Sequence, residues 1–217
     1  MSDIFDEVDE EVRREQLKKL WDRYGTLVIA LTIVVVLCVA AWQGYDYWQN
    51  KKAGELGAQF VAASLLAEQG KHEEAAKAFA AITETGTPGY RVLAGLREAS
   101  ELGERDPKAA VAAFDAVASN SATPQPLKDF AALRAAMLLA DTAPFAEVAG
   151  RLEPLAAAGA PFRHTARELL AFAAWKANDL AAVQKWTKLI VDDPETPPSL
   201  RQRVEVLTQL AAAGGHG

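Results

Sequence analysis

The stretch TLVIALTIVVVLCVAAW, from Thr26 to Trp42, restricts the fold more than any other feature of the chain, since it holds no charged residue. With its flanks it gives roughly 20 residues of helix, which at about 1.5 Å per residue cross the ~30 Å hydrocarbon layer of a bilayer. Aromatic side chains at both ends are typical of the membrane interface. We therefore predict a transmembrane helix over residues 25–45 with the interface anchors Trp21, Tyr24, Trp42, Tyr45 and Trp48.

A removable export signal is the alternative, because a small-x-small cleavage site can be drawn over residues 38–40. Against it, the leader is long and begins with the acidic SDIFDEVDEE. The apolar run is also longer than the ~7–15 residues of a signal core. A lipoprotein signal would need a small residue before the cysteine, and Leu37 stands there. The pattern favours a permanent anchor.

The basic residues around the span predict its orientation. Two lie just after it, Lys51 and Lys52, and five precede it, Arg13, Arg14, Lys18, Lys19 and Arg23. Positively charged flanks stay in the cytoplasm. Residues 1–24 are therefore predicted to be cytoplasmic, residues 46–52 to form a juxtamembrane linker, and the rest to lie outside, which in a bacterium is the periplasm. The only cysteine, Cys38, lies in the span, so the outer part has no thiol to mispair in an oxidising compartment.

Residues 53–213 carry turn signals at a nearly constant period, which indicates a repeat architecture. Prolines recur at 88, 124, 161 and 197, separated by 36, 37 and 36 residues, and each is expected to open a helix. A second set of breaks, near residues 70, 104–106, 141–142 and 178–179, divides each unit into two helices. We predict an all-α fold: a transmembrane helix, then a solenoid of about four α-hairpins, a capping helix over 197–213 and a disordered tail at 214–217.

The second helix of each predicted unit repeats an apolar trio at i, i+4 and i+7, which places the three side chains on one face. Each first helix has a small residue at a matching point, namely Ala63, Ala99, Ala136 and Ala171, so the paired helices can approach closely. Stacked hairpins bury such faces together, which a single hairpin cannot do. The predicted repeat core is Ala75, Phe79 and Ile82, then Ala110, Phe114 and Val117, then Val148, Leu152 and Leu155, then Ala182, Trp186 and Leu189.

The segment EQGKHEEAAKAFAAI, residues 68–82, resembles the tetratricopeptide repeat motif. The whole arrangement resembles the YfgM-like membrane proteins of Gram-negative bacteria: an acidic leader, REQLKKLWDRYG, one span, the aromatic exit AWQGYDYW and a short repeat array. The resemblance implies an ancillary subunit of the inner-membrane SecYEG translocon. Members of that family hold a tetratricopeptide-repeat-like domain in the periplasm, near emerging secretory chains and periplasmic chaperones.

Residues that could carry catalysis are scarce. The three histidines, at 72, 164 and 216, form no pair with metal-ligand spacing, and neither a phosphate-binding glycine loop nor a nucleophile elbow is present. The net charge of −6 is also unsuited to a phosphate backbone. We expect a non-enzyme with no cofactor, no metal, no small-molecule substrate and no nucleic-acid partner.

A row of basic side chains is the one candidate binding feature. Arg91, Lys128, His164 and Arg201 are spaced by 37, 36 and 37 residues, near the start of each predicted first helix. Positive charge there opposes the helix dipole, so another interaction is expected to hold it. A partner-binding stripe is one interpretation, and solvated side chains or salt bridges within the repeats are the other. A second pair with the same spacing is Arg97 and Arg134.

The sequence therefore predicts a single-pass scaffold of the bacterial inner membrane, in contact with lipid through one span. Its periplasmic domain would bind proteins near the Sec translocon, such as translocon subunits, periplasmic chaperones or exported chains, and assist the chaperones. Two alternatives stay open: an envelope or cell-division scaffold, and a membrane-anchored regulator of stress signalling.

Overall fold

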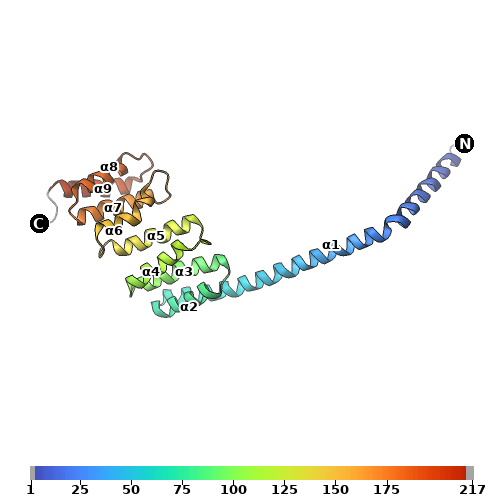
Figure 1. The fold of residues 1–217 in the computed structure, drawn as a ribbon, viewed down its shortest axis with the longest axis horizontal. Helices are drawn as coiled ribbons and strands as arrows, with labels where there is room; N and C mark the ends of the chain where they lie inside the picture. The colour runs from blue at the N-terminus through green and yellow to red at the C-terminus, as the bar shows by residue number, and fades with distance from the viewer. Residues whose placement is uncertain (1–2, 214–217) are drawn as a thin grey trace. The chain divides into compact units, whose positions relative to one another are not determined.

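The computed structural model describes residues 3–213, with side chains for Lys18 and 21–213, and within these residues there is no β-strand (Figure 1). The all-α prediction is confirmed for this part of the chain, while the predicted tail at 214–217 lies outside it. The helices are α1 (Asp3–Glu68), α2 (His72–Thr85), α3 (Pro88–Gly103), α4 (Pro107–Ser119), α5 (Gln125–Leu139), α6 (Phe145–Leu152), the 3-10 helix η1 (Pro154–Ala156), α7 (Arg163–Lys176), α8 (Leu180–Val191) and α9 (Pro198–Ala212).

The chain divides into two compact units, residues 1–55 and 56–217. In the first unit α1 is long and apolar enough to cross a membrane, and its apolar side chains are exposed rather than packed inside the protein. The hydroxyl of Thr32 donates to the carbonyl of Val28 at 2.8 Å, so this polar group is satisfied within the span. These properties fit a single-pass membrane anchor.

At both ends of the apolar stretch a positively charged side chain lies over an aromatic ring. The Arg23 guanidinium lies 5.7 Å from the ring centre of Tyr24, and the Lys52 ammonium lies 5.5 Å from that of Trp48. Residues 46–52, predicted as a linker, are helical and belong to α1 without a break. Since α1 runs on to Glu68, its last turns also supply the first helix of the repeat domain.

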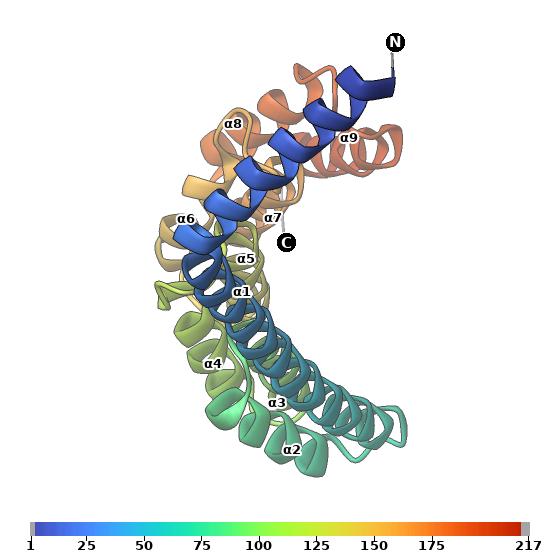
Figure 2. The same ribbon diagram turned by 90° about the vertical axis from the view of Figure 1, so that its right-hand side faces the viewer.

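The second unit is a row of helices in which each packs on the next, from α2 to α8, and α9 packs on both α7 and α8 (Figures 1 and 2). The end of α1 joins the row through Phe60, whose ring meets that of Phe79 edge-on at 5.1 Å. Buried apolar residues form successive clusters along the row rather than one central core. Contacts restricted to neighbouring units are the packing expected of a repeat protein.

Local chemistry explains where these helices begin. Pro88 and Pro107 are the first residues of α3 and α4, where the missing N–H of proline costs no helical hydrogen bond. The Asp106 carboxylate caps α4 by accepting from the amides of Lys108 and Ala109 at 3.1 and 3.0 Å. In contrast, Pro161 lies two residues before the first residue of α7, so it does not open that helix.

The third hairpin has a short second helix. α6 ends at Leu152, and the chain then forms the 3-10 turn η1 that begins at Pro154. Proline has no N–H to donate, and its ring clashes with the preceding turn of an α-helix, so α6 stops before it. Leu155 is still buried, because the 3-10 turn continues over the same apolar cluster.

The structure buries most of the predicted repeat core, including Phe79, Phe114, Leu152 and Trp186. Val117 and Ala182 are only half-buried. Leu189 is 39% exposed, and the buried residues around Trp186 are instead Val183 and Ile190. In the fourth unit the buried face is therefore turned by about one residue from the predicted face.

Candidate protein-binding surface

Three of the four basic residues in the predicted stripe are bonded to loops of their own domain. Arg91 Nε donates to the carbonyl of Gly86 at 2.9 Å, and Arg201 Nη2 donates to the carbonyl of Asp193 at 2.8 Å. His164 Nδ1 lies 3.1 Å from the Thr196 hydroxyl. Lys128 is half-buried in the first turn of α5. These hydrogen bonds hold the three side chains within their own domain, and a partner-binding stripe stays a prediction.

The second predicted pair has a repeated internal position. The Arg97 guanidinium lies 5.4 Å from the ring centre of Phe79, and that of Arg134 lies 5.9 Å from the ring centre of Phe114. Arg97 Nη2 is also 3.3 Å from the carboxylate of Glu101. Both arginines thus cover core rings of successive units, where cation–π attraction stabilises them.

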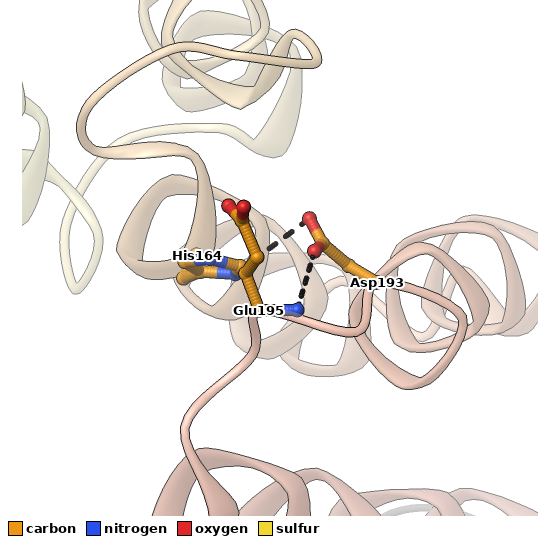
Figure 3. Close-up of side chains that lie close together, drawn as sticks. All are labelled: His164, Asp193 and Glu195. Atoms are coloured by element: carbon orange, nitrogen blue, oxygen red, sulfur yellow. Dashed lines mark hydrogen bonds and ion pairs between the residues drawn. The ribbon is translucent and has the colours of Figure 1, made fainter.

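A cluster of possible metal ligands lies where α7 meets the α8–α9 loop. His164, Asp193 and Glu195 each offer a donor atom, and these atoms lie within 4.8 Å of one another (Figure 3). Cations of the protein already occupy this place. Asp193 Oδ2 accepts from Arg163 Nε and from Arg167 Nη1, each at 2.9 Å, while Arg163 also pairs with Glu195. Asp193 Oδ1 accepts from the amide of Glu195 at 3.0 Å.

These bonds explain the electrostatics of the cluster. The hydrogen bond from Arg163 is the main reason that the pKa of Asp193 lies well below its usual range. Burial, followed by the positive charge of Arg163, lowers the pKa of His164. A metal ion would have to displace two guanidinium groups from Asp193 and would be repelled by them. We therefore interpret the cluster as a set of ion pairs that holds the α8–α9 loop on α7, rather than as a metal centre. We call this set, formed by Arg163, Arg167, Asp193 and Glu195, the ion-pair lock.

Arg167 is the centre of this lock, and it is only 5% exposed. Its Nε donates to the carbonyl of Ala156 at 3.0 Å, and its Nη1 donates to the carbonyl of Leu189 at 3.0 Å. One side chain of α7 therefore binds η1, the end of α8 and the loop that follows. Sequence reasoning missed Arg167, because an arginine inside an amphipathic helix is usually solvated.

Asp193→Asn is expected to lower the free energy of unfolding at neutral pH, because it removes a carboxylate that is stabilised by two arginines. The folded-state pKa of Asp193 is depressed, so its contribution is present above the unfolded value of 3.8 and is lost as the pH falls toward the folded value. The difference between the two proteins should be constant from pH 7 to about 5 and shrink below about pH 4. Urea denaturation across this pH range measures it; a difference that grows in acid would contradict the assignment.

Ion pairs also connect equivalent places in successive units. Both terminal nitrogens of Arg151 donate hydrogen bonds to the carboxylate of Asp115, at 2.6 and 3.1 Å, across 36 residues of sequence. Arg203 also makes a two-pronged contact, in which its Nε and Nη2 donate to the carboxylate of Glu168 at 2.6 and 2.9 Å, across 35 residues. Partly exposed pairs add little stability, but their two-pronged geometry favours one register of the stacked helices.

An apolar hollow of about 490 Å³ lies between α5 and α7, and we call it the α5/α7 cleft. Met137 from α5 is 40% exposed on it and Phe172 from α7 is 39% exposed, beside Leu169. At the rim, Lys176 Nζ donates to the carbonyl and carboxylate of Asp141 at 2.7 and 3.1 Å. Exposed apolar groups around a hollow of this size can hold an apolar side chain of another protein.

A family model described as a tetratricopeptide repeat-like domain matches residues 18–186, from the basic flank of the span into α8. Comparison of the chain with curated proteins and with solved structures found no match.

Proposed function

Because this chain belongs to the tetratricopeptide repeat-like family, whose repeat domains generally bind proteins and do not catalyse reactions, we propose that it is a membrane-anchored binding scaffold. The anchor is α1, placed in the bacterial inner membrane with its N-terminus in the cytoplasm. The repeat domain stands in the periplasm, near the Sec translocon, and assists periplasmic chaperones with exported proteins. Support for this orientation comes from the excess of basic residues before the span.

The α5/α7 cleft is the observation that carries the binding role. Methionine is flexible and adapts to differently shaped apolar groups, while a phenylalanine ring offers a large rigid surface. Met137 and Phe172 present both kinds of contact on the same hollow. A segment of an exported chain that has not yet folded exposes apolar side chains, so its chemistry matches the cleft.

Membrane attachment raises the effectiveness of a weak contact. The span confines the domain to the membrane surface, where partners in the same membrane are at a high effective concentration. Affinity of the cleft for one apolar side chain can then be modest, which allows each bound segment to leave again. A tethered site of this kind would capture chains at the translocon exit without trapping them.

The assignment to the translocon is supported by the resemblance to YfgM-like proteins over the leader, span and aromatic exit. It is tested by crosslinking in intact cells, followed by purification of the full chain and mass spectrometry. Translocon subunits, chaperones and exported chains among the products would support it. Division or cell-wall proteins instead would favour an envelope scaffold. If the acidic segment 2–12 proved necessary for a stress response, a signalling regulator would be favoured.

The cleft itself is tested with a charged substitution. Phe172→Asp should remove most of the captured exported chains, because a carboxylate in the cleft opposes burial of an apolar side chain. Leu189→Asp is the matched control, since Leu189 is also 39% exposed but lies on α8, away from the cleft. Equal capture by both variants, whether high or low, would contradict the role of the cleft.

A further inference from the structure

A cavity of about 420 Å³ opens between α2 and α3, bounded by the loop that leads to α4. Its walls include the small or apolar side chains of Ala76, Ala80 and Leu102. Acidic and basic side chains surround them, among them Glu98 on α3. The volume lies within the range of ~300–1,000 Å³ that is typical of ligand sites, so the pairing of its charges decides what it can bind.

Most charges of the cavity have partners within the domain. Glu73 pairs with Lys77 at 2.8 Å and with Arg105, so both of these cations are engaged. Asp106 caps α4, and its carboxylate accepts two backbone amides there.

A second acid of the cavity is paired as well. Glu101 is only 7% exposed and accepts from His72 Nδ1 at 2.8 Å, with Arg97 Nη2 at 3.3 Å. His72 and Arg97 thus approach the same carboxylate from opposite elements, α2 and α3. This group has little capacity left for a ligand.

Glu98 is the exception. Among the residues that the structure describes, none places a cation within ion-pair distance of its half-buried carboxylate. Burial raises the pKa of Glu98, and the negative charge of Glu84 acts in the same direction, opposed by a hydrogen bond from Thr83. The Thr83 hydroxyl also donates to the carbonyl of Phe79 at 3.1 Å, so its single proton is shared between two acceptors.

We infer that the α2/α3 cavity binds the cationic side chain of a lysine or arginine from a partner polypeptide, with Glu98 as its counter-charge. The methylene stem of such a side chain would lie over Ala76, Ala80 and Leu102, while its charged head meets the carboxylate. A metal ion is a poorer occupant, because one carboxylate that lacks a cation offers too few oxygen ligands. The inference goes beyond the proposed function, since this surface differs from the α5/α7 cleft and binds by charge.

The test uses the full chain in neutral detergent micelles and short peptides that carry an uncharged fluorophore. The peptides differ only at their central residue, which is lysine, acetyl-lysine or glutamate. Fluorescence anisotropy should show that the lysine peptide binds at least about tenfold more tightly than the acetyl-lysine peptide, as expected for a charged hydrogen bond. Equal binding of these two peptides, or no binding of either, overturns the inference.

Two variants then assign the effect to Glu98. Glu98→Gln should abolish the preference for lysine while raising the melting temperature at pH 7, because it removes a carboxylate that burial disfavours. Because the folded-state pKa of Glu98 is raised, ionisation of this group increasingly destabilises the fold as the pH rises above the unfolded value of 4.5. Glu205→Gln, an exposed acid on α9, removes the same charge away from the cavity and should keep the preference. A lysine preference that survives Glu98→Gln would overturn the inference.

Discussion

Phe79→Ala is expected to lower the free energy of unfolding by about 3–5 kcal/mol, the usual loss for a buried phenylalanine. Phe79 is fully buried between α1, α2 and α3, with the ring of Phe60 at 5.1 Å and the guanidinium of Arg97 at 5.4 Å. Truncation would leave a cavity and remove both ring contacts. Ala63 and Ala94 of the same cluster are too small to fill the space.

The effect of Phe79→Ala should also be local, since stability in a repeat protein is a sum of units and nearest-neighbour interfaces. Hydrogen exchange on the full chain in micelles should show faster exchange over residues 56–103 than over 163–212. Leu93→Ala is the control, because Leu93 is largely exposed on α3 and its truncation should change little. Equal losses for the two variants would contradict the assignment of Phe79 to the core.

Arg167→Met is expected to lower the free energy of unfolding by about 3 kcal/mol, because it removes the hydrogen bonds of a buried guanidinium and leaves the buried carbonyl of Ala156 without a donor. Methionine keeps the apolar stem but leaves the carbonyls of Ala156 and Leu189 without this donor. Urea denaturation measures the loss. Arg203→Met is the matched control. It also removes an arginine that makes two hydrogen bonds, here to Glu168, but the side chain of Arg203 is half-exposed. Arg203→Met should lower the free energy of unfolding much less than Arg167→Met does. A larger loss for Arg203→Met would contradict the role of Arg167 in the ion-pair lock.

The repeat period was predictable because proline and glycine act locally. Gly70 follows the end of α1 with a φ of +74°, Pro88 is the first residue of α3, and Pro124 and Pro197 immediately precede α5 and α9. The buried face of α8 was less predictable. Its sequence LAAVQKWTKLIV has apolar residues in two adjacent registers, and packing against α7 and α9 selects Val183 and Ile190 over Ala182 and Leu189.

The candidate sites depend on tertiary contacts that no local pattern contains. Arg167 meets acceptors that are 11 and 22 residues away in sequence. Glu98 differs from Glu73 and Glu101, the ion-paired acids of its cavity, by lacking a cation, which follows from the packing of α2 on α3. The α5/α7 cleft likewise arises where two helices that are separated in sequence by α6 and η1 leave Met137 and Phe172 exposed side by side.

If membrane attachment makes the weak binding domain effective, releasing the domain from the membrane should lower its capture of exported chains. A photoreactive phenylalanine analogue at Phe172 would be placed in the full chain and in a chain whose residues 1–50 are replaced by a cleavable export signal. At equal abundance in intact cells, tethering predicts that release from the membrane lowers the crosslinking yield to exported chains by at least about a hundredfold. An unchanged yield from the released domain would show that tethering does not drive the capture of exported chains.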